Sequence, residues 1–254
     1  MKQRYRLVIL VLSSCGGVWD EFRRIWELYA HRFPEVKTYF IYAGEDNKEP
    51  KPSDLVFRNI KDSYPMNIER TLEAFKYIES KYDYDFLLRT NLSTFWDLER
   101  LLKNLDNLPT ENCYQGDGPL PPWYSPESRY YLSGVDTIVN RSMVDKIVNI
   151  DEAMRQCLIN EVHGSRRKPR GTEPEDSAMG RFFHGFLGAP MIKSNIHMME
   201  HLGMVFDNHS HIHREISLAE ALNHDHFRIK SAVNRESADP VIMNVLYQHY
   251  YGDK

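Results

Sequence analysis

The sequence contains few cysteines, only Cys15, Cys113 and Cys157 among 254 residues. They are odd in number, widely separated and without metal-site spacing, so they indicate a reducing compartment rather than a disulfide framework or a zinc centre. Positive charge is also scarce, because 32 Lys and Arg face 36 Asp and Glu, for a formal net charge of -4. Proteins that bind nucleic acid need a clustered positive surface, so that class is disfavoured.

Long apolar runs are missing as well. The apolar residues 7–12 follow a basic segment and precede Ser13, Ser14 and Cys15, an arrangement that resembles a lipoprotein signal. This run is shorter than the roughly 7 to 15 residues of a signal core, which favours a buried first strand. No segment approaches the roughly 18 to 20 apolar residues that span a bilayer, so we expect no stable membrane insertion.

Several motifs of well-known sites are absent. The sequence has neither G-x-G-x-x-G nor G-x-x-x-x-G-K-[ST], which excludes the usual glycine-rich nucleotide loops. It also lacks G-x-S-x-G and H-E-x-x-H, so a Ser-His-Asp hydrolase of the elbow type and a zincin are unsupported. The basic run 166–170 predicts a solvated loop, with a mobile loop that meets phosphates or an anionic acceptor as the alternative.

The first hundred residues alternate between strand and helix patterns. Apolar runs that predict strands lie at 5–12, 36–42, 55–59 and 86–89. Helical spacing of apolar residues occurs at 19–33 and 67–81. This alternation predicts an α/β fold, with a mostly parallel twisted sheet flanked by helices. The second half is less regular, with an apolar stretch at 135–139, a helix at 142–150 and another opened by residues 173–180.

The fourth predicted strand ends in the polar triplet Arg89, Thr90 and Asn91. Ligands of parallel sheets bind outside the carboxyl ends of the strands, so this triplet is a candidate to face a ligand. The alternative is that it caps the helix that begins near Asp97. The residues alone leave both interpretations open.

Two further groups carry possible chemistry. Glu175 and Asp176 stand at a predicted helix start, where free N–H groups and the helix dipole keep a carboxylate ionised and able to act as a general base. Capping by Glu173 or Asp176 is the alternative. The segment 208–213, "NHSHIH", offers alternating histidines for a metal, although solvated or core histidines are commoner.

Six blocks follow one another from near the N-terminus to about Gly180: VILVLSSCGG, VKTYFIYAG, DSYPMNIERT, FLLRTNLSTFWDLERLL, PPWYSPESRYYLSG and EPEDSAMG. In this order they resemble the β-1,3-galactosyltransferase and fringe family of glycosyltransferases. The resemblance implies one GT-A domain over residues 1–254, with a donor-nucleotide half at about 1–108 and an acceptor and catalytic half at about 109–254. It also implies an inverting hexosyl transfer from a UDP-sugar to a hydroxyl of a glycan acceptor, usually with Mn²⁺ or Mg²⁺.

Carried over by position, the resemblance makes Asp176 the general base. The positions it assigns to the nucleotide sugar are Ser13, Ser14, Asp62, Ser63, Tyr64, Asn67, Arg89, Thr90 and Asn91. Those it assigns to the acceptor are Trp123, Tyr124, Tyr131, Ser133, Gly134 and Glu175. His209 is the first histidine candidate for the metal and His211 the second. The absence of an anchor and of paired cysteines departs from Golgi members, so we expect a soluble bacterial or viral enzyme in the cytosol.

The departure from the family lies in the opening of the fourth block. Family members read K-T-D-D-D-x-F where this chain reads RTNLSTF, so Asn91 and Ser93 stand in place of aspartates. Divalent ions prefer charged oxygen ligands. We therefore expect a weak Mn²⁺ or Mg²⁺ site at Asn91, Ser93, His209 and His211. Cationic side chains in place of the metal, with Arg89 the nearest, are the second possibility, and loss of activity is the third.

Two other functions remain open from the sequence. One is a non-catalytic module that binds a nucleotide sugar or a glycan and has lost its metal. The other is a metal-dependent hydrolase built on the histidine cluster.

Overall fold

The computed structural model describes residues 2–44, 50–62, 67–117, 132, 134–164, 175–194, 197–201, 204–207, 214–216, 222, 224–231 and 234–252. Several predicted site residues lie outside these ranges: Ser63, Tyr64, Trp123, Tyr124, Tyr131, Ser133, Glu173, His209 and His211, with the basic run 166–170. In the described part of the chain, no helix is both long and apolar enough to cross a membrane.

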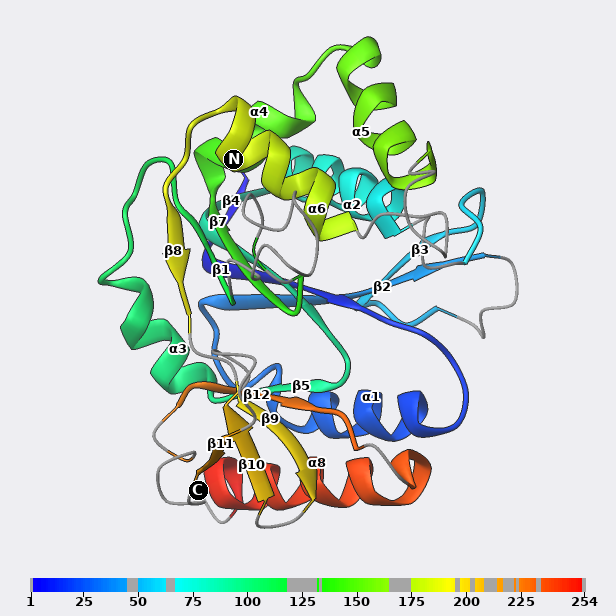
Figure 1. The fold of residues 1–254 in the computed structure, drawn as a ribbon, viewed down its shortest axis with the longest axis vertical. Coiled ribbons are helices and arrows are strands. Elements are labelled where there is room, and N and C mark those ends of the chain that lie inside the picture. The colour runs from blue at the N-terminus through cyan, green and yellow to red at the C-terminus, as the bar shows by residue number, and fades with distance from the viewer. Residues whose placement is uncertain are drawn as a thin grey trace.

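A seven-stranded sheet forms the centre of the protein (Figure 1). Its strands, in spatial order, are β3 (Asp54–Phe57), β2 (Val36–Ala43), β1 (Gln3–Leu12), β4 (Tyr82–Asn91), β7 (Asp136–Asn140), β6 (Tyr114–Gly116) and β8 (Met191–Lys193). The strands from β3 to β4 are parallel, β7 is antiparallel to both neighbours, and β6 and β8 are parallel. The predicted mostly parallel sheet is confirmed.

Helices cover both faces of this sheet (Figure 1). On one side lie α2 (Asn67–Lys81), α4 (Arg141–Val148), α5 (Glu152–Gly164) and α6 (Glu175–Gly180), and on the other α1 (Val18–Tyr29) and α8 (Arg235–Tyr251). Alternate side chains of β1 enter different cores, because Leu7 and Ile9 pack on the α1 side and Val8 and Leu10 on the α2 side. A strand buried on both faces reads as a continuous apolar run, which is why β1 could be predicted.

A second, five-stranded sheet lies beside the first and was not predicted. Its strands, in spatial order, are β11 (Arg214–Ile216), β10 (Met204–Asp207), β9 (His197–His201), β12 (His226–Ile229) and β5 (Thr94–Trp96). Helix α8 passes along it (Figure 1). Tyr251 of α8 donates its hydroxyl to the carbonyl of Trp96 at 3.0 Å, which ties the helix to β5.

The stretch 87–97 connects the two sheets. Strand β4 continues through Asn91, two residues further than predicted, and β5 begins at Thr94 after the buried pair Leu92 and Ser93. Helix α3 (Leu98–Leu105) follows, and its first turn is capped by Asp97, whose carboxylate accepts from the backbone N–H of Arg100 at 3.2 Å. The alternative that the polar triplet caps this helix is therefore wrong.

Other predicted elements differ mainly at their ends. The predicted helix 67–81 is confirmed by α2, whereas the one predicted at 19–33 begins at Val18 and ends at Tyr29. The helix predicted from 173–180 begins at Glu175 and continues into a π-helical segment, η3 (Arg181–Phe186).

Candidate functional site

A pocket of about 290 Å³ opens at the carboxyl end of β4. We call it the strand-end pocket; it is lined by Asn67, Arg89, Asn91, Gly134, Val135, Glu175, Asp176, Arg228 and Lys230. A smaller cavity of about 10 Å³ adjoins it and shares Arg89, Gly134, Glu175 and Asp176. The lining comes from β4, the residues before β7, the starts of α2 and α6, and the end of β12. This is the position that the rule for parallel sheets predicts for a ligand.

The polar triplet divides between the pocket and the core. Arg89 and Asn91 line the pocket, as expected of two residues on one face of a strand. Thr90 points the other way and is fully buried. Its hydroxyl donates to the carbonyl of Val135 at 2.7 Å and accepts from Trp96 Nε1 at 3.1 Å. Thr90 therefore joins β4 to the residues before β7 and to β5, and its hydroxyl is already occupied.

Arg89 and Glu175 form a buried ion pair. Arg89 Nη2 donates to Glu175 Oε2 at 2.6 Å, and the other carboxylate oxygen accepts from Thr71 Oγ1 of α2 at 2.6 Å. The pair joins β4, α2 and α6 at the floor of the pocket. Both charges are compensated within the protein, while the phosphate role predicted for Arg89 and the acceptor role predicted for Glu175 stay predictions.

Gly134 allows the arginine to reach this position. A Cβ atom built at residue 134 would lie 2.5 Å from Arg89 Nη1, which is closer than real Cβ contacts, and 3.0 Å from Arg89 Cζ. The guanidinium therefore packs against a glycine because any other side chain would push it away from Glu175. This gives Gly134 a structural reason beside its predicted place on the acceptor side.

Asp176 stands at the first turn of α6 and lines the pocket while remaining partly exposed. Its Oδ2 accepts from the backbone N–H of Gly134 at 3.1 Å, and its Oδ1 from that of Ser177 at 3.1 Å. Burial raises the pKa of this carboxyl above its ordinary value, and the nearby Arg89 guanidinium opposes the rise. The position at a helix start predicted that the carboxylate would stay ionised, that is, with a low pKa. The structure differs, because burial has the larger effect and raises the pKa. A carboxylate with a raised pKa is a better proton acceptor.

Two cations that were not predicted from the sequence come from β12 and from the residue that follows it. Arg228 and Lys230 line the pocket, while Phe227 and Ile229, between and beside them, are fully buried in the core. This period of two is the ordinary alternation of a strand. Burial, together with the neighbouring guanidiniums of Arg235 and Arg89, lowers the pKa of Arg228 to about 10, and the nearby carboxylate of Asp239 opposes this change.

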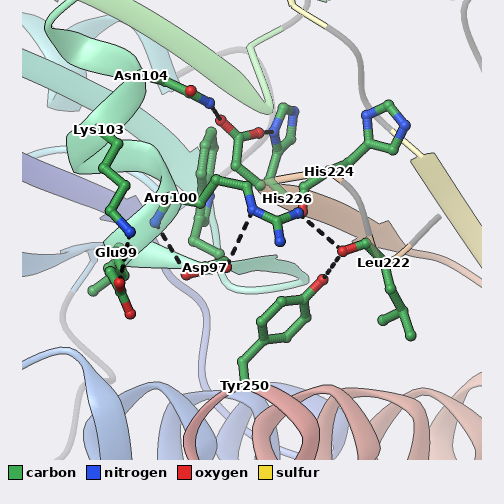
Figure 2. A network of polar contacts seen from close by, with 12 residues as sticks. Asp97, Glu99, Arg100, Lys103, Asn104, Leu222, His224, His226 and Tyr250 are labelled. Atoms are coloured by element: carbon green, nitrogen blue, oxygen red, sulfur yellow. Dashed lines mark hydrogen bonds and ion pairs between the residues drawn. The ribbon is translucent and has the colours of Figure 1, made fainter. Parts of the chain in front are cut away.

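A polar network holds the start of β12 in place (Figure 2). Arg100 of α3 donates to the carbonyls of Leu222 and His224, at 2.9 and 3.0 Å, and Tyr250 of α8 donates to the carbonyl of Leu222 at 3.0 Å. Asn104 donates to Asp225 Oδ2 at 2.7 Å. The strand that carries the two cations is thus tied to two helices.

His226 links the two sheets beneath the pocket. Its Nδ1 lies 2.6 Å from Asp225 Oδ1, its Nε2 lies 3.3 Å from Asp136 Oδ2 of β7, and its ring stacks on Trp96 with centroids 4.2 Å apart. The ring and Asp136 are both buried. The carboxylates of Asp225 and Asp136 outweigh the cost of burial and raise the pKa of His226 to about 10. His226 is therefore a positively charged imidazolium at neutral pH.

Of the residues predicted to bind the nucleotide, the structure describes Ser13 and Ser14 after β1, Asp62 before α2, Asn67 at the start of α2, and Arg89, Thr90 and Asn91 in β4. Arg70 of α2 is buried and its Nη1 donates to the carbonyl of Ser13 at 3.3 Å and to Asp62 Oδ1 at 3.5 Å. The Ser13 hydroxyl donates to the carbonyl of Val11 at 2.9 Å, so it is used within the strand end. Ser14 follows it and is half-buried, while Asn67 lines the pocket.

The described residues fit a divalent metal poorly. Among the predicted ligands, Asn91 lines the pocket with a neutral amide, whereas Ser93 is fully buried and outside the lining. Glu175 is already paired with Arg89 and Thr71. Within the described ranges, no three His, Cys, Asp or Glu side chains form a group that could hold a metal ion. His209 and His211 lie outside those ranges, so a metal site that uses them stays a prediction.

Comparisons with known proteins support the fold. No protein-family model matches the chain, and no curated protein matches its sequence. Among solved structures, it is similar to the crystal structure of a glycosyltransferase involved in the glycosylation of the major capsid of PBCV-1. The match has a TM-score of 0.51 and 12% identity, and it covers 94% of this chain and 99% of the other. The predicted resemblance to the fringe family was not found, and at this identity the likeness concerns the fold: the chain has a fold similar to that of a glycosyltransferase.

Proposed function

We propose that the protein is an inverting glycosyltransferase that moves a hexose-type sugar from a UDP-sugar to a hydroxyl of a glycan acceptor. The observation that carries this proposal is the position of Asp176. Its partly exposed carboxylate lies in a pocket at the carboxyl ends of the strands, together with cations, in a chain whose fold resembles that of a glycosyltransferase. One base and a cationic region are what a single displacement at a sugar phosphate requires.

In the proposed reaction, Asp176 accepts the proton of the acceptor hydroxyl while that oxygen attacks C1 of the donor sugar. The bond between C1 and the diphosphate oxygen breaks, and its electrons stay on the diphosphate, which gains one negative charge. A single in-line attack inverts the configuration at C1. Groups that stabilise the new charge lower the barrier because they interact more strongly with the transition state than with the donor.

The contacts of Asp176 support its role as the base. Both oxygens accept backbone N–H groups, which fixes the carboxylate in the pocket while leaving lone pairs available to a substrate hydroxyl. Its raised pKa increases its basicity, and Arg89 prevents the pKa from rising further. The base is thus oriented by Gly134 and tuned by the Arg89 and Glu175 pair beneath it.

The test begins with a panel of UDP-sugars, screened by thermal shift, because a ligand that binds the folded state raises the melting temperature. UDP release is then measured with water and with glycan acceptors for the wild type, Asp176→Asn and the control Asp106→Asn. Asp106 is an acidic residue with a 71% exposed side chain, paired with Arg6. We expect kcat to fall about 10²- to 10⁴-fold in Asp176→Asn, and to remain unchanged in the control.

Proton NMR of the product gives the anomeric configuration. A product with retained configuration would contradict the inverting mechanism. UDP-sugar binding with no turnover that depends on Asp176 would contradict the catalytic proposal and favour the non-catalytic binding module.

A further inference from the structure

The charges that line the strand-end pocket do not cancel. Three cations contribute to it, Arg89, Arg228 and Lys230, and two carboxylates, Glu175 and Asp176. Arg89 and Glu175 neutralise each other at 2.6 Å. The remaining groups are two cations from the end of β12 and the partly exposed Asp176.

Arg228 differs from an ordinary surface arginine. Among the described residues its buried Nη1 has no hydrogen-bond partner, and Asp239, the carboxylate whose charge acts on it, is bound to Arg235. Arg235, whose charge lies near it, is already held by Asp239 at 2.9 Å. A buried charge is costly unless it is paired and hydrogen-bonded. The arrangement therefore favours an anionic ligand that would complete the contacts of Arg228.

The strand geometry places both free cations on the same wall. Arg228 and Lys230 are two residues apart, and the core residues Phe227 and Ile229 alternate with them. Arg228 is half-buried at the pocket and Lys230 is exposed. A guanidinium binds two phosphate oxygens at once, and an ammonium on a flexible stem binds as a point charge. Two neighbouring cations of this kind match two linked phosphates.

We propose that Arg228 and Lys230 bind the diphosphate of the nucleotide sugar and stabilise the charge that the leaving group gains, without a divalent metal. The proposal rests on the glycosyltransferase function proposed above. It also follows from the disagreement at Asn91 and Ser93, where the described residues supply no charged ligand for a metal. The cations that take its place come from β12 rather than from Arg89, which is held by Glu175.

Calorimetry of UDP, inorganic pyrophosphate and uridine tests this site, in EDTA and in Mn²⁺. The variants are Arg228→Gln, Lys230→Gln and Arg228→Lys, with Lys103→Gln as the matched control. Lys103 is a 71% exposed lysine that pairs with Glu99 on α3, so the control removes the same charge elsewhere. Uridine lacks phosphates, so its affinity reports whether a variant still folds and keeps the rest of the pocket.

The wild type is expected to bind UDP in EDTA. Loss of one charge-assisted contact is expected to weaken UDP and pyrophosphate binding about 10- to 100-fold in each Gln variant. Arg228→Lys is expected to lose less than Arg228→Gln. The control is expected to bind UDP as the wild type does, and uridine affinity is expected to stay constant throughout.

Three results would overturn the proposal. If UDP binds in Mn²⁺ but not in EDTA, a metal holds the diphosphate, although the glycosyltransferase function stands. If both Gln variants bind UDP and pyrophosphate like the wild type, the cations have another role. If the wild type binds neither UDP nor pyrophosphate, in EDTA or in Mn²⁺, the site and the proposed function both fail. UDP binding that depends on the cations, with turnover indifferent to Asp176, would instead support the site and remove the catalytic function.

Discussion

Replacing His226 is predicted to weaken the protein in a way that depends on pH. The imidazolium of His226 lies between Asp225 and Asp136 and stacks on Trp96. His226 and Asp136 are buried, so water does not solvate their charges. In His226→Gln the two carboxylates lose their shared cation. Removing one partner of a buried ion pair costs about 3 to 5 kcal/mol, because the remaining charge is uncompensated.

The pKa gives the pH range of this effect. It rises from 6.5 to about 10 on folding. Because the folded-state pKa is raised, the stabilisation is fully present below pH 6.5 and is lost as the pH rises through about 10. A shift of this size corresponds to about 5 kcal/mol at most, of which about 4 kcal/mol is present at pH 7. Within the range from pH 6 to 10, wild type and His226→Gln should therefore differ most at about pH 6 and converge as the pH approaches 10.

Urea unfolding at several pH values between 6 and 10 measures the difference, with His31→Gln as a control at an exposed histidine. The control should follow the wild type at each pH. If the unfolding free energies of wild type and His226→Gln differ by the same amount from pH 6 to 10, the charged pairing of His226 with the two carboxylates is wrong.

Three further predictions concern the pocket and the core beside it. Glu175→Gln should lower the free energy of unfolding by about 3 kcal/mol or more, because it leaves Arg89 buried with a neutral partner; denaturant titration measures this, and an unchanged midpoint would contradict the pairing. Thr90→Val should lower the free energy of unfolding by about 1 to 3 kcal/mol, since it leaves Trp96 Nε1 and the partly buried carbonyl of Val135 without their partner. The same assay checks it, and a loss below a few tenths of a kcal/mol would show that the hydroxyl contacts contribute little. The acid limb of kcat/KM should lie above the ordinary pKa of 3.8 for Asp176, because burial raises that pKa and the base must be deprotonated to act. Arg89→Asn should move this limb to a higher pH, because the Arg89 guanidinium lowers the pKa of Asp176. An unchanged limb would show that Arg89 does not influence the titration of Asp176.

The sequence predicted the elements whose signals are local. Strand β1 reads as an apolar run because both of its faces are buried, and α2 shows one clear apolar stripe. The second sheet was missed because β5 and β11 have three residues each and β12 has four. Runs this short carry little periodic information.

The candidate site was predicted only in part, because local sequence patterns do not report contacts between distant residues. Arg89, Asn91 and Asp176, which were predicted from their positions at strand and helix ends, line one pocket together with Gly134, which was predicted from the family resemblance. The pairing of Arg89 with Glu175 joins residues 86 positions apart, and no local pattern reports such a contact. The residues 226–230, "HFRIK", do alternate between polar and apolar side chains, and this signal could have pointed to the cations of β12.

The short connector between β4 and β5, Leu92 and Ser93, bears on the activation barrier of the proposed reaction. Its carbonyls are held from both sides, since Trp26 Nε1 donates to Leu92 at 3.0 Å and the N–H of Ile229 donates to Ser93 at 2.8 Å. Ile229 is the last residue of β12 and lies between Arg228 and Lys230, so the backbone that carries both cations is anchored to the connector between β4 and β5. The backbone around the proposed donor site is therefore held in place without a ligand. Such a preorganised site needs little reorientation as charge moves to the leaving group, which is the property that separates a protein interior from water as a medium for this reaction.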